Sequence, residues 1–305
     1  TLNPSSAASD VYKRQPLWQY SACEIVTAIQ NGEISAEAAA SAAVNRMREV
    51  NPDLNAVVED LGEQAVEHAT ALDQQRAAGQ PCGPLHGVAV TIKINVDQAG
   101  HATSNGVLAL KDNIAHQDAP VVRNLTKAGA VIIGRTNTPE FSFRADTDNP
   151  LHGRTHNPWG RHVSPGGSSG GAASAVMSGC GALAHGNDIG GSLRFPAAAT
   201  GAVTVKPSLG RVPAYNPSQK AERGMLAQAM SVQGLITRSA ADLQLSMPAL
   251  IAPDIHDPFH VPLPYRGSAI NGPVRVAVSK ASFGFELHPE LSLIHISEPT
   301  RLGFI

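Results

Sequence analysis

The sequence predicts an α/β fold, because strand-like segments alternate along the chain with segments of helical periodicity. Residues 88–94 (VAVTIKI) form a short, mostly apolar run rich in β-branched side chains, which is typical of a buried strand. Helical patterns precede and follow this run, and no internal repeat is visible. With 305 residues, 42% of them hydrophobic, the chain has enough apolar mass for a large core.

Three helices are expected before this strand. Residues 21–30 begin with Ser21 and Glu24 at the Ser-x-x-Glu spacing of a capping box, and apolar residues then recur at helical spacing. Residues 36–50 and 61–78 are rich in alanine and in other good helix formers. These segments predict a helical region at the start of the chain.

Further helices and strands are expected after the strand. Asp118 as N-cap, Pro120 in the first turn and Gly129 at the C-terminal end predict a helix between them. The remaining expected helices are 169–177 and 240–251, and the remaining expected strands are 131–133, 202–205 and 274–279.

Charge and cysteine content exclude several classes of protein. The chain has 23 basic and 25 acidic residues, a net charge of −2 and no long basic run, so we expect no nucleic-acid partner. No stretch approaches 18 consecutive apolar residues, so we expect no membrane span. The three cysteines cannot form a disulfide framework and show no CxxC spacing. We therefore expect a reducing, cytoplasmic location.

The two ends of the sequence differ from the rest. Residues 1–15 lack the apolar segment and cleavage site of a secretory signal, and residues 292–305 follow no helix or strand pattern. Both resemble translated sequencing-adapter read-through, so we expect non-native tails around a single domain at 16–291 that is incomplete at its C-terminus. Two ordinary frayed termini are the alternative.

A glycine-rich, uncharged segment is the strongest chemical signal. Residues 166–201 hold 10 of the 28 glycines, and no Asp, Glu, Lys or Arg lies between Arg161 and Asp188. Glycine permits tight turns and allows main-chain N–H groups to face a ligand. The segment therefore predicts backbone packed closely around a small molecule.

Three generic motifs in this part of the chain are weaker. Residues 167–171 match G-x-S-x-G around Ser169, but a Pro/Gly loop replaces the strand that a nucleophile elbow requires. Gly179, Gly181 and Ala184 fit a dinucleotide-binding pattern, but a helix-like segment precedes them. The three histidines at 152, 156 and 162 come with no carboxylate ligand set, so we expect no metal site.

Taken together, the motifs resemble the amidase signature family. The segments that carry the resemblance are GGSSGG at 166–171, DIGGSLRFPA at 188–197, Gly201, Lys206-Pro207, GPLHGVAVTIK at 83–93 and NPDLNA at 51–56. The likeness runs from about residue 17 to at least residue 279. It implies a single α/β domain with a central mixed β-sheet flanked by helices.

The resemblance also implies a Ser–cis-Ser–Lys catalytic triad. The nucleophile of the family's GGS-[IL]-R motif matches Ser192, the bridging serine in a cis peptide matches Ser168, and the base matches Lys93. The main-chain N–H groups implied to form an oxyanion hole are those of Ile189, Gly190, Gly191 and Ser192. Supporting roles are expected for Ser169 and for an Asp188–Arg194 ion pair.

The chemistry makes this set of residues reasonable. A serine hydroxyl becomes a good nucleophile only when a neighbouring base removes its proton. Lysine can act as that base only when neutral, so its pKa must fall by roughly 3 units from about 10.4 through desolvation. The charge-free segment suits this requirement, and Ser168 can relay a proton because a hydroxyl both donates and accepts.

Two positions depart from the family's pattern. The family often places Asp directly after the lysine, where this chain has Ile94-Asn95, and Thr or Ser before Asp188, where this chain has Asn187. Both departures could change the polarity of the pocket. The aromatic residues near the motifs, either pocket lining or plain core, are Phe141, Phe143, Trp159 and Phe195.

The resemblance implies an amidase that cleaves a small-molecule carboxylic amide to an acid and ammonia or an amine, with no metal and no cofactor. Two alternatives stay open: the glutaminase-type subunit of a tRNA-dependent amidotransferase, and an inactive truncated fragment. The sequence leaves the oligomeric state open, a homodimer included.

Overall fold

The computed structural model describes residues 15–219, 224–267 and 272–273. The chain divides into two units, Thr1–Tyr265 and Arg266–Ile305, and the elements below all belong to the first. The strand expected at 274–279 lies outside the described residues, as do the expected tails except for Gln15.

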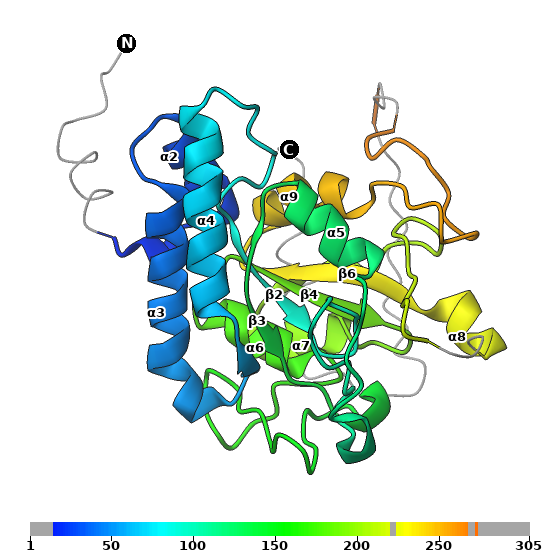
Figure 1. Cartoon of the computed structure of the whole chain (residues 1–305). Helices are drawn as coiled ribbons and strands as arrows, with labels where there is room; N and C mark the ends of the chain where they lie inside the picture. The colour runs from blue at the N-terminus through cyan, green and yellow to red at the C-terminus, as the bar shows by residue number, and fades with distance from the viewer. Residues whose placement is uncertain (1–14, 220–223, 268–271, 274–305) are drawn as a thin grey trace. The chain divides into compact units, whose positions relative to one another are not determined.

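A six-stranded mixed sheet forms the centre of this unit, in the order β1-β3-β2-β4-β6-β5 (Figure 1). Strand β3 is parallel to β2, and β2 is parallel to β4, whereas β1, β6 and β5 each pair antiparallel with their neighbours. The strands are β1 (Val57–Asp60), β2 (Ala89–Lys93), β3 (Val131–Thr136), β4 (Leu183–Asp188), β5 (Val203–Thr204) and β6 (Val232–Thr237). The predicted α/β class and mixed sheet are confirmed.

Helices surround the sheet in the described part of the chain. The α-helices are α2 (Ala22–Gln30), α3 (Ala36–Leu54), α4 (Gly62–Ala77), α5 (Pro120–Lys127), α6 (Gly170–Met177), α7 (Arg194–Thr200), α8 (Met225–Met230) and α9 (Ala240–Leu250). Three short 3-10 helices are η1 (Leu17–Gln19), η2 (Leu108–Leu110) and η3 (Glu140–Ser142). Helices α3 and α4 run side by side, α4 packs against β3, and α6 contacts β2, β4 and β6.

The first helices begin where their capping residues predict. The Glu24 amide donates to Ser21 Oγ (3.1 Å) and the Ser21 amide donates to Glu24 Oε2 (2.7 Å), so the expected capping box is present. Ser35 caps α3 by accepting from the Ala38 amide at 2.9 Å. Helix α3 continues beyond the expected end at residue 50 and stops at Asn55, which is left-handed with φ 49°.

Several local expectations were wrong or incomplete. The N-cap of α5 is Ala119. Asp118 was expected there, but its carboxylate instead accepts from the Ala99 amide at 2.7 Å. The sequence patterns also failed to indicate β1, β4, β6 and α7. Strand β4 (LAHGND) has no β-branched residue and ends in polar ones, so pairing with β2 and β6 decides its conformation rather than propensity.

The core lies on both faces of the sheet because adjacent residues of a strand point to opposite faces. On β4, Leu183 belongs to the large cluster built with α3, α4, α5 and α9, whereas Ala184 joins a smaller cluster with α6. On β6, Leu235 and Ile236 divide in the same way. With both faces covered, every residue of β2 is buried, including its last one.

The parallel strands bring polar residues together at one edge of the sheet. Strands β2, β3 and β4 run in the same direction, so their C-terminal residues, Lys93, Thr136 and Asp188, lie at the same edge. In α/β sheets, the crevice at the carboxyl ends of the strands is the usual place for a ligand. Helix α6 begins beside this edge, and its glycines set how closely it approaches.

Gly171, in the first turn of α6, generates a stability prediction. A Cβ at this position would lie 2.6 Å from the backbone N and O of Asn137 and 2.8 Å from the Ala56 carbonyl oxygen. Backbone cannot move aside as a flexible side chain does, so we expect Gly171→Ala to lower the free energy of unfolding by about 1–3 kcal/mol. Urea denaturation measures the change.

Gly267→Ala is the matched control, because no described atom lies within 4 Å of a Cβ at Gly267. We expect a change within about 0.5 kcal/mol for this variant. Equal stability of Gly171→Ala and the parent protein would show that α6 is not held by this close approach.

Candidate active site

Lys93, the last residue of β2, has a completely buried side chain. Its Nζ lies 2.7 Å from Ser168 Oγ, 3.1 Å from Ser169 Oγ and 2.8 Å from Asn187 Oδ1. All three partner atoms belong to neutral groups. The structure therefore brings together Lys93 and Ser168, which are 75 residues apart in sequence.

The two serines occupy the turn that leads into α6. The peptide bond between Gly167 and Ser168 is cis, as the resemblance implied, and both hydroxyls are buried. Gly186 of β4 makes room for Ser169, since a Cβ at Gly186 would lie 2.8 Å from Ser169 Oγ. A loop, not a strand, precedes Ser169, so the context that a nucleophile elbow requires is absent here.

Desolvation controls the charge of the amine. Burial disfavours the ammonium form and lowers the pKa of Lys93 from 10.5 to about 7, although the charge of Asp188 opposes this shift. Near neutral pH the amine is thus divided between its charged and neutral forms. A neutral amine has a lone pair and can accept a proton.

Histidine does not take this role in the described part of the site. His185, on β4, is fully buried, and its Nε2 pairs with Gln233 Oε1 at 2.9 Å. Desolvation lowers the pKa of His185 to about 4, with a smaller contribution from the charge of Lys93. The imidazole is therefore neutral near pH 7 and is occupied by Gln233.

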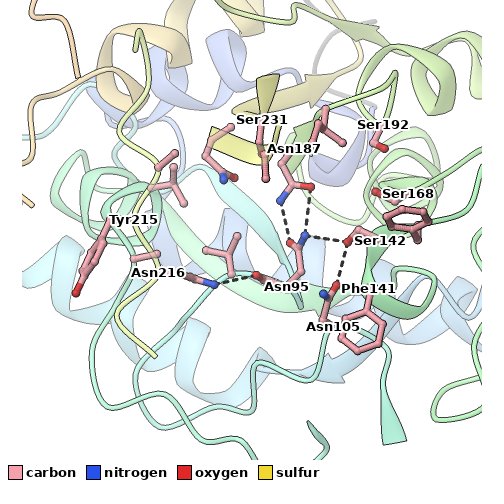
Figure 2. A pocket seen from close by; sticks show the side chains of 18 of the residues that line it. Asn95, Asn105, Phe141, Ser142, Ser168, Asn187, Ser192, Tyr215, Asn216 and Ser231 are labelled. Atoms are coloured by element: carbon pink, nitrogen blue, oxygen red, sulfur yellow. Dashed lines mark hydrogen bonds between the residues drawn. The ribbon is translucent and has the colours of Figure 1, made fainter. Parts of the chain in front are cut away.

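Ser192 faces a pocket of about 320 Å³ that Ser168 and Asn187 also line (Figure 2). Its side chain is partly exposed, and the described residues give its hydroxyl no hydrogen-bond partner. Ser192 lies in the turn between β4 and α7, so a hydroxyl accessible to a ligand sits next to the buried lysine and serines.

Asp188 and Arg194 organise this turn. Arg194 Nε and Nη2 each lie 3.0 Å from an oxygen of the Asp188 carboxylate, which also accepts from the amides of Gly191 (2.8 Å) and Leu193 (3.1 Å). The expected ion pair is present. Burial raises the pKa of Asp188, but these hydrogen bonds outweigh burial and hold it below its usual value.

One expectation for the oxyanion hole does not fit this arrangement. The Gly191 amide donates to Asp188 Oδ1 and is therefore not available to a ligand. The amides of Ile189, Gly190 and Ser192 have no hydrogen-bond partner among the described residues. They surround the exposed side of the turn, where Ile189 and Gly190 are accessible.

A row of amide and hydroxyl groups forms another wall of the pocket, and the sequence motifs assign no roles to it. Asn187 Nδ2 donates to Asn95 Oδ1 (3.0 Å), and Asn95 Nδ2 donates to Asn187 Oδ1 (3.2 Å). Asn95 Nδ2 also donates to Ser142 Oγ (3.0 Å), which donates to Asn105 Oδ1 (2.9 Å) (Figure 2). The only signal in the sequence was that Asn95 and Asn187 flank expected site residues.

The aromatic expectations divide. Phe141 and Phe143 line the pocket, whereas Trp159 and Phe195 do not. The Trp159 indole instead donates to the Thr200 carbonyl at 2.7 Å. Phe141 has φ 51°, in the left-handed region, and its side chain is 60% exposed, so it borders the opening of the pocket rather than the core.

The described residues contain no group of three or more His, Cys, Asp or Glu side chains that could hold a metal ion, the histidines at 152, 156 and 162 included. Gly179 and Gly181 precede β4 instead of following a strand, which removes the context of the dinucleotide pattern. No described helix is both long and apolar enough to cross a membrane.

Comparison with known proteins supports the resemblance. The amidase family profile matches residues 38–294. Indoleacetamide hydrolase of Bradyrhizobium diazoefficiens is 54% identical over 277 residues, which cover 91% of this chain and 53% of that protein. The matching glutamyl-tRNA(Gln) amidotransferase polypeptide of Moorella thermoacetica is 37% identical over 288 residues, covering 91% of this chain and 57% of that polypeptide.

A solved structure agrees with the fold. A bacterial aryl acylamidase of the amidase signature enzymes superimposes with a TM-score of 0.75 at 33% identity, covering 82% of this chain and 51% of the other. The chain thus spans about half the length of the relatives that it matches. The profile match, the level of identity and the shared fold lead to one conclusion: this chain belongs to the amidase signature family.

Proposed function

We propose that the protein hydrolyses a carboxylic amide to an acid and ammonia or an amine through an acyl-serine intermediate. The observation that carries this proposal is the buried Lys93 amine, 2.7 Å from Ser168 Oγ and next to a pocket that Ser192 lines. Ser192 is the nucleophile, Ser168 the proton relay and Lys93 the base. Family membership and the name of the relative at 54% identity support the same chemistry.

Proton transfer and bond formation are coupled in the first step. Neutral Lys93 takes the proton of Ser168, and Ser168 takes the proton of Ser192, while Ser192 Oγ attacks the amide carbon. The carbonyl oxygen gains negative charge, which the N–H groups of Ile189, Gly190 and Ser192 stabilise; one such donor typically contributes about 3 kcal/mol. The Gly191 amide is left out because Asp188 occupies it.

The second half of the reaction returns the proton. The ammonium of Lys93 gives its proton back through Ser168 to the departing nitrogen as the C–N bond breaks, which leaves the acyl group on Ser192. Water then attacks the ester, with the same lysine as base, and the acid departs. No metal or other cofactor has a part in this scheme.

We propose amides of aromatic acids as the substrate class. Phe141 and Phe143 line the pocket and provide apolar contact for an aromatic group. The curated relative at 54% identity is named for an aromatic acetamide. The three free cysteines fit a cytoplasmic location.

The role of the nucleophile generates the first prediction here. In the protein expressed from its complete gene, Ser192→Ala is expected to lower kcat/KM for amide hydrolysis by at least about 10³-fold, because no acyl-enzyme can form. Ammonia release from indoleacetamide measures it. Ser208→Ala is the control, since Ser208 is exposed and does not line the pocket. Wild-type turnover in Ser192→Ala would disprove the proposal.

The pKa of Lys93 predicts the pH dependence. The base form exists above a pKa of about 7, so kcat/KM should rise as the pH is raised through about 7 and fall below it as the amine is protonated. Lys93→Arg keeps the positive charge at every accessible pH and should lose about 10²–10⁴-fold in kcat/KM, with no such rise. A pH profile of kcat/KM tests this, and an unchanged profile in Lys93→Arg would exclude Lys93 as the base.

The amidotransferase alternative predicts a different substrate range. If the protein acts as an amidase, the purified chain should release ammonia from aromatic amides without any partner, and glutamine should be a poor substrate because the pocket offers aromatic side chains to it. Parallel ammonia assays on indoleacetamide and glutamine separate the two functions. Activity on glutamine alone, and only with added partner proteins, would favour the amidotransferase, and Ser192→Ala serves as the blank in both assays.

A further inference from the structure

The Lys93 amine has more hydrogen-bonding neighbours than a neutral amine can use in more than one way. A neutral amine has two N–H donors and one lone pair, and Nζ contacts three atoms: Ser168 Oγ, Ser169 Oγ and Asn187 Oδ1. Its lone pair can serve as a base toward Ser168 only if the other two neighbours accept hydrogen bonds. The structure determines the roles of both.

Asn187 can only accept from Lys93, because its amide orientation is fixed from the other side. Its Nδ2 donates to Asn95 Oδ1 at 3.0 Å, and its Oδ1 receives Asn95 Nδ2 at 3.2 Å. This reciprocal pair turns the Asn187 carbonyl oxygen, which has no hydrogen to give, toward Nζ at 2.8 Å. A flipped amide would place NH₂ opposite the amine and would break the pairing with Asn95.

Ser169 is restricted in the same sense. Its hydroxyl donates to the Asn187 carbonyl oxygen of the backbone at 3.4 Å, so its lone pairs are what it offers to Nζ at 3.1 Å. Both N–H donors of a neutral Lys93 then point at Ser169 and Asn187. The lone pair points at the remaining neighbour, Ser168.

We propose that Asn187, held by Asn95, is a positioning residue that directs the lone pair of Lys93 at Ser168. The inference rests on the proposed function, since it assigns a role within the proposed Ser192–Ser168–Lys93 relay. It links the two positions at which this chain departs from the family's pattern, because Asn95 and Asn187 contact each other across the ends of β2 and β4.

The charges around the amine make a substitution at Asn187 easy to interpret. The ionisable groups that act on Lys93 are Asp188 and His185, both on β4, while the start of α6 contributes only the hydroxyls of Ser168 and Ser169. Gln233 of β6 is neutral and bound to His185. Asp188 is already bound to Arg194, so a new carboxylate at 187 would be the one negative charge in direct contact with Nζ.

The test follows the rate at which a fluorophosphonate probe labels the protein from its complete gene, as a function of pH. This readout depends on the nucleophile and its base and not on which amide is the natural substrate. In Asn187→Asp the carboxylate keeps the acceptor but stabilises the ammonium form of Lys93. We expect the midpoint of the rise in labelling rate to move up by about 1 pH unit or more.

Asn95→Leu tests the same idea without adding a charge. It releases the Asn187 amide, which can then turn NH₂ toward the lone pair and compete with Ser168. We expect labelling at the high-pH plateau to fall by about tenfold or more. Asn105→Asp is the matched control. It places the same charge on the pocket wall, two hydrogen bonds beyond Asn95, and should leave the pH midpoint in place.

The outcomes separate the inference from the function on which it rests. Ser192→Ala should not be labelled; labelling of that variant at the wild-type rate would overturn both the nucleophile and the positioning role. If Ser192→Ala is inert, a midpoint unchanged in Asn187→Asp together with a wild-type plateau in Asn95→Leu would overturn the positioning role alone. A midpoint that moves equally in Asn187→Asp and Asn105→Asp would also overturn it, since the charge would then act without regard to position.

Discussion

Burial of a single amine at the end of β2 is the constraint that organises this structure. A change in the pKa of Lys93 from 10.5 to about 7 corresponds to about 5 kcal/mol of lost preference for the charged form. The fold maintains this by placing neutral oxygens around the amine and apolar residues behind it. The stability that such a group costs must come from the rest of the core.

The architecture explains how neutral surroundings arise next to a buried carboxylate. Asp188 is close enough to influence Lys93, but Arg194 and the backbone amides of the turn hold its oxygens. Its charge therefore serves to shape the β4–α7 turn that presents Ser192. The carboxylate and the amine are neighbours on one strand edge with separate tasks: one builds the turn, and the other keeps a lone pair.

The pocket wall extends this logic toward the ligand. Asn95, Ser142 and Asn105 form a chain of neutral hydrogen bonds from Asn187 to the aromatic side chains at the pocket mouth. Polar orientation is thereby supplied without a further charge that would shift the amine. An apolar acyl group and a neutral amide are the chemistry that such a wall suits, in keeping with the proposed substrate class.

Local sequence determined the parts that depend on neighbours along the chain. The capping box at Ser21, the buried run that ends in Lys93 and the glycine-rich turn before α6 are encoded in short motifs, and the family resemblance named Lys93, Ser168 and Ser192. Tertiary structure decided the rest. Strand β4 has weak propensity and forms through pairing with β2 and β6. The Gly191 amide is directed to Asp188 by the shape of its turn. The partnership of Asn95 with Asn187 spans 92 residues and arises only when parallel strands end at one edge of a sheet, because hydrogen bonds between distant segments have no local signature.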